Sequence, residues 1–332
     1  MMVHWLIFLL TAAGIIAAGI KLASFAEAIG KRTGIGQGWI GLLFLATVTS
    51  FPELTTTITG ASIGVPNIAV GNALGSNLFN IAIIGLMDIL LIKRGPFLLK
   101  VRSYHIASGG IVVLLTALVM LGIVIAPKID LFGISPVSFL ILIVYVGGVF
   151  LLYHIEKSEA IPGSAPAETM PLLHAVGGFL ACTAIIIVAG IFLVSASKAI
   201  TTETAISGSV MGAVLVAIVT SLPELSASIG ALRIGAYDMI IGNLFGSNMF
   251  NILTIFFADA AFRGGSILTE LGQGAPDQLI VAALGIVLAS AVIIAIGYRS
   301  HRRILGMGAD ALVLLVGYLV SVYLIINRGI NV

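Results

Sequence analysis

Ten apolar segments, each long enough to cross the roughly 30 Å hydrocarbon core of a bilayer, follow one another along almost the whole sequence. Hydrophobic residues make up 59% of the 332 residues and charged residues only 9%, whereas a soluble domain carries about 25% charged residues. We therefore expect an all-α membrane protein of the cell membrane, with lipid as its main partner. The expected transmembrane helices span 4–29, 37–63, 67–92, 104–126, 133–155, 172–197, 207–230, 237–262, 278–298 and 308–327.

Several other classes of protein are disfavoured. A net charge of +2 is too small to suggest a nucleic-acid partner, and nothing in the sequence indicates an obligate protein partner. The single cysteine, Cys182, lies in an apolar segment, so disulfides play no part. No Lys or Arg precedes the first apolar segment, which is long enough to span, so we expect a retained helix and not a signal peptide.

The sequence contains an internal repeat. Residues 46–81 align without a gap on residues 217–252 at a constant offset of 171. The two copies share Thr-Ser, Pro-Glu, Gly-Asn and Gly-Ser-Asn, which hydrophobicity alone does not explain. We predict two homologous five-helix repeats, 1–155 and 172–332, joined by the polar linker 156–171.

The odd number of spans in each half predicts the relation between the halves. The second half must enter the membrane from the opposite side, and such inverted repeats are typical of secondary transporters with a site at the midplane. Eleven Lys and Arg residues fall in the loops on one side and four on the other, so the positive-inside rule places both termini outside.

Two acidic residues fall near the centres of repeated spans. Glu53 and Glu224 obey the offset, and a charge at that depth costs about 2.5–3.5 kcal/mol, so it is retained with a partner or for a function. No Lys or Arg lies at comparable depth in the repeat helices. Two protonated carboxyls bonded to hydroxyls remain an alternative, but the symmetric placement favours a cation site.

Prolines precede both glutamates. Pro52 and Pro223 remove a backbone donor inside each helix, which frees the carbonyls of Val48 and Val219. A simple kink would have the same sequence signature. Beside Thr49-Ser50 and a glutamate, however, the pattern favours a broken helix whose carbonyls bind ions.

The third and eighth spans each carry polar side chains on one face. Their spacing is i, i+4, i+8 and repeats with the offset, in Asn72, Ser76 and Asn80 and in Asn243, Ser247 and Asn251. The pairs Gly71 with Gly75 and Gly242 with Gly246 form GxxxG motifs, to which we assign close helix packing. Asp88 and Asp259 also repeat, and we expect them to form interfacial ion pairs with Lys93 and Arg263, with a role in an ion pathway as the alternative.

The candidate ligands are all oxygens. Hard cations such as Ca²⁺ bind six to eight oxygens at about 2.3–2.6 Å, whereas the repeat motifs contain no His or Cys for softer metals. The five histidines fall at or near span ends, so we expect a transporter with no cofactor and not an enzyme.

The two motifs resemble the alpha-repeats of the cation/calcium exchanger superfamily, especially its sodium/calcium exchangers. The resemblance lies in TSFPE (49–53) with GNALGSNLFN (71–80), and in TSLPE (220–224) with GNLFGSNMFN (242–251). It implies antiport of Ca²⁺ and Na⁺ by alternating access. Calcium would be bound by Glu53, Glu224, Thr49 and Thr220; sodium would be bound by the same glutamates with Ala46, Ser50, Ser76, Asn80, Ala217, Ser221, Ser247 and Asn251.

The same resemblance bears on the coupling ion. Potassium-dependent relatives carry Asp where this chain has Asn251, so the resemblance implies potassium-independent exchange, which we expect to be electrogenic. A proton/calcium antiporter of the same superfamily is the alternative. A cation channel is less favoured, because a channel normally assembles a carboxylate ring from symmetric subunits, whereas one chain here supplies both acids.

Overall fold

In the computed structural model, the described residues are 2–91, 95–126, 133–158, 170–203, 219–304 and 306–328. Helices dominate this part of the chain. They are α1 (Met2–Thr33), α2 (Gln37–Trp39), the π-helix η1 (Ile40–Leu45), α3 (Ala46–Thr49), α4 (Phe51–Ser62), α5 (Pro66–Leu90), α6 (His105–Ile125), α7 (Pro136–Ser158), α8 (Leu172–Glu203), α10 (Leu222–Arg233), α11 (Tyr237–Ala261), α12 (Ala275–Tyr298) and α13 (Ala309–Arg328). The 3₁₀ turns η2 (Leu98–Lys100) and η3 (Gly272–Gly274) and a hairpin of β1 (Arg303–Ile304) and β2 (Met307–Gly308) lie in loops.

The expected all-α membrane fold is confirmed. Eight of the described helices are long and apolar enough to cross a membrane alone, and the bent pair Gln37–Thr49 and Phe51–Ser62 forms a ninth span. The seventh expected span, 207–230, is described from residue 219 onward, where it continues into α10. The expected boundaries agree with the helices to within a few residues, apart from α8, which extends to Glu203.

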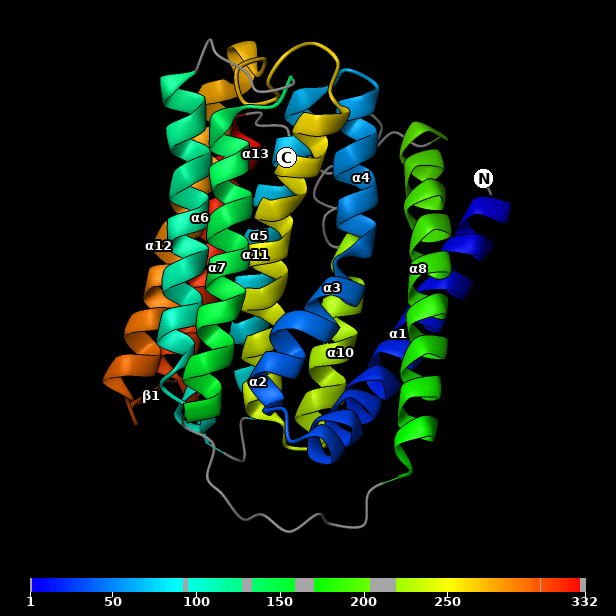
Figure 1. The fold of residues 1–332 in the computed structure, drawn as a ribbon, viewed down its shortest axis with the longest axis vertical. Helices are drawn as coiled ribbons and strands as arrows, with labels where there is room; N and C mark the ends of the chain where they lie inside the picture. Colours follow the sequence, from blue (N-terminus) through cyan, green and yellow to red (C-terminus); the bar gives the residue numbers. More distant parts are fainter. Residues whose placement is uncertain are drawn as a thin grey trace.

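Helices α5 and α11 form the centre of the molecule. Both are buried over most of their length, whereas α1, α7, α8 and α13 leave most of theirs exposed to the surroundings, as helices facing lipid do. Figure 1 shows α6, α7 and α12 on one side of this centre and α1 and α8 on the other. The broken second span and α10 lie between the central pair and the pair α1–α8.

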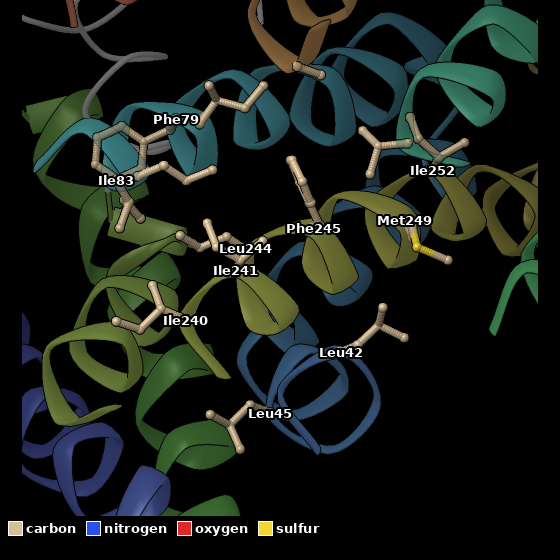
Figure 2. Close-up of a cluster of buried hydrophobic side chains, with 14 of the residues drawn as sticks. Leu42, Leu45, Phe79, Ile83, Ile240, Ile241, Leu244, Phe245, Met249 and Ile252 are labelled. Atoms are coloured by element: carbon tan, nitrogen blue, oxygen red, sulfur yellow. The ribbon is translucent and has the colours of Figure 1, made fainter. Parts of the chain in front are cut away.

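The second span packs very closely on α11. An added Cβ at Gly242 would collide with the carbonyl oxygen of Gly38, and one at Gly246 would collide with that of Leu42, so only glycine fits at either position. These contacts confirm the packing role predicted for the second GxxxG pair, while that of Gly71 and Gly75 stays a prediction. Figure 2 shows Leu42 beside Phe245 and Met249 in the buried cluster at this contact.

Asp259 does not form the ion pair with Arg263 that the sequence predicted. Its carboxylate accepts hydrogen bonds from the backbone N–H of Ser135 (2.7 Å), the hydroxyl of Ser138 (2.6 Å) and the backbone N–H of Ile267 (2.6 Å). Ser135 immediately precedes α7, so the negative charge lies at a helix N-terminus, where unpaired N–H groups favour it. Burial explains the correction, because backbone donors reach this carboxylate and an exposed arginine at the surface does not.

Asp88 has the equivalent position in the first half. It accepts the backbone N–H of Phe97 and, at 2.7 Å, that of Gly308, which immediately precedes α13. Its expected partner Lys93 lies outside the described residues. Each aspartate therefore joins the end of the third helix of its own half to the start of the last helix of the other half.

Glu156 connects the opposite end of the molecule. It lies buried in the last turn of α7, which continues to Ser158 and so takes in the first residues of the expected polar linker. Its carboxylate accepts the backbone N–H groups of Gly38 (2.9 Å) and Trp39 (2.6 Å) at the start of the second span, together with the Arg102 guanidinium (3.0 Å) and the Tyr104 hydroxyl (3.1 Å). Burial, together with the charge of Glu156, raises the pKa of Tyr104, so its phenol keeps the proton it donates.

We predict that Asp259→Asn lowers the apparent melting temperature of the purified protein. All three partners of Asp259 are donors, so an asparagine would set its NH₂ group against an N–H or O–H and lose the charge that strengthens the other bonds. The expected cost is about 2–4 kcal/mol. Thermal unfolding in detergent would measure it, with the exposed nearby substitution Glu270→Gln as control; equal melting temperatures for both variants would contradict the assigned role.

Candidate functional site

The second span is broken at its middle. Its first part runs from α2 through the π-helical η1 into α3, which ends at Thr49. Its second part is α4, which begins at Phe51 and is bent by 49° relative to the first. Pro52 in the first turn of α4 has no N–H, so it cannot donate to the carbonyl of Val48. The break therefore interrupts the backbone hydrogen bonding beside Glu53, as the sequence predicted.

The seventh span has the same break. Ser221 has φ −88° and ψ 12°, and Ser50 has φ −86° and ψ 13°, so the two helices restart with the same backbone geometry. Pro223 and Glu224 occupy the first turn of α10 just as Pro52 and Glu53 occupy that of α4. Both glutamates are fully buried, with side chains that are 0% exposed.

The two breaks are linked through their serines and glutamates. The Ser50 hydroxyl donates to Glu224 Oε1 at 2.9 Å, and the Ser221 hydroxyl donates to Glu53 Oε1 at 3.2 Å. Each serine thus bonds the glutamate of the other repeat and not the one three residues along its own chain. The structure brings the two carboxylates into one site shared by both halves.

Polar side chains of α5 and α11 support the breaks. The Asn72 amide donates to the carbonyl of Glu53 at 3.2 Å, and the Asn243 amide donates to that of Glu224 at 3.5 Å. The Thr49 hydroxyl lies 3.3 Å from Asn243 Oδ1 and 3.4 Å from Ser247 Oγ. Asn72 on α5 and Asn243 and Ser247 on α11, which belong to the predicted polar faces, therefore contact the broken spans.

Five buried side-chain oxygens at these positions have no hydrogen-bond partner in the described part of the chain: Glu53 Oε2, Glu224 Oε2, Asn80 Oδ1, Asn251 Oδ1 and Ser76 Oγ. Buried polar atoms are nearly always paired, so a group left unpaired calls for a partner of another kind. All five are oxygens, and two belong to carboxylates. A hard cation such as Ca²⁺ is the partner that suits such a set, because such ions bind oxygen ligands.

The same residues argue against softer metals. Among the described residues, no three His, Cys, Asp or Glu side chains gather to hold a metal ion. The donors beside the two glutamates are amides and hydroxyls, which suit Ca²⁺ or Na⁺ and not a transition metal. Glu53 and Glu224 are the two acidic side chains that the described part of the chain brings to this site.

Most of the predicted ligands lie around this site. Ala46 directly follows the π-helical turn, and Thr49, Thr220, Ser221 and Ser247 are buried beside the glutamates or on the same helix faces. The repeats differ at one equivalent serine, because Ser247 Oγ lies 3.4 Å from Glu224 Oε1, whereas Ser76 Oγ has no partner among the described residues. Ala217 lies outside the described residues.

Asn77 and Asn248 also belong to the site's surroundings, although sequence reasoning did not single them out. Both are buried, and they exchange hydrogen bonds across the contact between α5 and α11. Their signal was present in the sequence, since they are polar, lie in membrane spans and obey the offset of 171.

A family model for the sodium/calcium exchanger protein matches residues 3–154 and 174–327 of the chain. The chain belongs to this family. The inner membrane protein YrbG of Escherichia coli is 30% identical over 73% of this chain and 75% of its own length. The sodium/calcium exchanger MaX1 of Methanosarcina acetivorans is 25% identical over 78% of this chain and 83% of its own length.

The solved structures agree on the fold. The sodium-calcium exchanger NCX_Mj superposes with a TM-score of 0.72 over 97% of this chain and 98% of its own, at 20% sequence identity. The chain is thus a multi-pass membrane protein of the cation/calcium exchanger superfamily, a transporter and not an enzyme, and its substrates are cations.

We predict that Glu53→Gln and Glu224→Gln each abolish calcium exchange while the protein stays folded. A glutamine keeps one oxygen to accept the serine hydroxyl but replaces the unpaired oxygen with an NH₂ group, which repels a cation. Loss of a buried charge should also ease membrane insertion. Uptake of radioactive calcium into proteoliposomes would measure activity and thermal unfolding would measure folding, with Glu270→Gln as control. Wild-type exchange in both single variants would contradict the site.

Proposed function

We propose that the chain exchanges Ca²⁺ for Na⁺ by alternating access, with both ions competing for one site at the midplane. The observation that carries the proposal is the pair of buried carboxylates, each bonded by the serine of the opposite repeat and each keeping one unpaired oxygen. No described cationic side chain pairs with either one, so transported cations are the available counter-charge.

The proposed ligands follow from the family resemblance together with this geometry. Calcium is bound between Glu53 and Glu224, with Thr49 and Thr220. Sodium is bound on both sides of that position by the same glutamates with Ser50, Ser76, Asn80, Ser221, Ser247 and Asn251 and the carbonyls of Ala46 and Ala217. The unpaired oxygens of Ser76, Asn80 and Asn251 support the outer positions.

Charge balance predicts competition and an electrical signature. Two carboxylates are neutralised by one calcium or by two sodium ions, so the two kinds of ion should displace one another. One further sodium would make the cycle electrogenic, and a membrane potential would bias it by roughly 2.3 kcal/mol per 100 mV for each net charge.

The proposed architecture is that of two inverted five-helix repeats, 1–155 and 172–332, joined by the linker 156–171, with both termini outside. The excess of Lys and Arg in the loops on one side supports this orientation. Helices α1 and α8 occupy equivalent places in the repeats, pack along one another, and contact α10 and α4 respectively. We assign the movement between the two access states to this pair, because its members expose most of their surface to lipid.

The first test compares driving ions. Calcium uptake into proteoliposomes should rise with internal sodium, fall with external sodium, and respond to a potential imposed with valinomycin, but should be indifferent to a pH gradient. Uptake that ignores internal sodium and follows the pH gradient would establish proton coupling instead. Uptake that needs no counter-ion at all would indicate a channel.

The second test concerns potassium. Because Asn251 supplies a neutral amide where potassium-dependent relatives carry a carboxylate, we predict that sodium-driven calcium uptake is unchanged when choline replaces potassium on both sides of the membrane. A fall in uptake that potassium restores would contradict this prediction without affecting the first.

A further inference from the structure

Four asparagines join α5 to α11 in a closed set of hydrogen bonds. The Asn77 amide donates to the carbonyl of Asn248 at 3.2 Å, and the Asn248 amide donates to the carbonyl of Asn77 at 3.3 Å. The side-chain oxygens of the same two residues then accept a second pair of bonds. Asn251 donates to Asn77 Oδ1 at 3.1 Å, and Asn80 donates to Asn248 Oδ1 at 3.0 Å.

These bonds fix the orientation of each side-chain amide, because each one distinguishes its oxygen from its NH₂ group. Asn77 and Asn248 cannot turn over, because each would then set its oxygen against a backbone carbonyl. Their oxygens are thereby held toward the NH₂ groups of Asn251 and Asn80. The oxygens of Asn251 and Asn80, which have no partner among the described residues, are left facing away from the set.

We propose that Asn77 and Asn248 are positioning residues that hold the oxygens of Asn251 and Asn80 toward the transported sodium ions. An asparagine side chain presents either an acceptor or a donor, and only the acceptor end binds a cation. A free amide would sample both orientations, and one of them would aim an NH₂ group at the ion. The inference rests on the proposed function, since it assigns sodium to Asn80 and Asn251.

The arrangement has two features that simple helix association does not require. Every residue in it is at most 4% exposed, so each member is held in a region where an unsatisfied amide is costly. It also follows the offset of 171 in all four members, as the ion site itself does. If the four asparagines served only to hold α5 against α11, the loss of any one bond between the two helices would change the sodium dependence of exchange in the same way.

The first experiment uses Asn77→Leu and Asn77→Asp. Leucine removes the acceptor for Asn251, so we expect the half-saturating sodium concentration to rise about fivefold to tenfold, with a smaller change for calcium and a maximal rate close to that of the wild type. A protonated aspartate keeps an oxygen facing Asn251 and donates its O–H to the backbone carbonyl of Asn248, so we expect sodium half-saturation within about twofold of the wild type. Thr116→Val, a buried hydroxyl that bonds only its own helix, is the control.

The second experiment places Asn77→Leu in an Asn251→Asp background. A carboxylate has oxygen at both ends, so its orientation no longer matters, and Asn77→Leu should then leave sodium half-saturation unchanged or lower it. Asn77→Leu would then raise the half-saturating sodium concentration in the wild-type background but not in the Asn251→Asp background. A loss of packing would raise it in both, so the difference measures a coupling between the two positions.

The outcomes separate the two proposals. If Asn251→Leu leaves the sodium dependence of exchange unchanged, the ligand assignment fails and the proposed sodium site with it. Suppose instead that Asn251→Leu weakens sodium dependence, that Asn77→Leu and Asn77→Asp raise the half-saturating sodium concentration equally, and that Asn77→Leu has the same effect in the Asn251→Asp background. Asn77 then serves only packing, and the inference alone is overturned. Should Asn77→Leu fail to fold, two other measurements decide the question by the same comparison. One is the Asn77→Asp variant, and the other is the coupling between Asn248→Asp and Asn80→Asp, which change the equivalent pair of residues.

Discussion

Two carboxylates buried at the centre of a membrane protein, with no described lysine or arginine beside them, are the constraint on which the rest of this structure depends. A buried charge is tolerated only with strong local partners. Here those partners are serine hydroxyls and the N-terminal ends of α4 and α10, where both glutamates lie, and none of them neutralises a carboxylate completely. On the proposed function, the ions that the protein transports supply the charge that this site lacks.

The inverted repeat explains how one such site arises from two copies of a motif. Each copy brings a serine and a glutamate to a break in a helix, but Ser50 bonds Glu224 and Ser221 bonds Glu53. Each carboxylate therefore accepts a hydroxyl hydrogen bond from the other half, and Glu224 accepts a longer one from Ser247 of its own half. The same exchange between halves recurs away from the site, where Asp88 and Asp259 each bond the start of the last helix of the other repeat. Each half thus supplies hydrogen bonds to the acidic side chains of the other half, both at the site and at the ends of α5 and α11.

The sequence predicts the elements of this arrangement well, because the offset of 171 marks every polar residue that occurs in both copies. The breaks at Pro52 and Pro223 followed from proline chemistry, and the polar faces of the third and eighth spans followed from the spacing of polar residues in apolar segments. These features are local, so a single sequence is enough to find them.

Partners across the structure could not be predicted in this way. A serine three residues from a glutamate in sequence suggests a local bond, and only the approach of the two repeats makes the distant glutamate the acceptor. Asp259 was expected to pair with Arg263 because the two are close in sequence, yet its carboxylate accepts backbone N–H groups from Ser135, which precedes α7, and from Ile267 in the loop after α11. The π-helical turn η1 and the capping of the second span by Glu156 likewise depend on packing against distant segments.

On the proposed function, the same charge constraint accounts for why transport takes the form of exchange. Moving between access states requires the site to close, and closing it without ions would leave two carboxylates together in a medium of low dielectric constant, where like charges repel strongly. One calcium or a set of sodium ions removes that penalty, so either loaded form can close while the empty form is held back. Since both carboxylates are bonded by serines from opposite repeats, an ion bound at one glutamate is sensed by both broken helices at once. A carrier that crosses only when loaded must return with another ion, which is the definition of an exchanger.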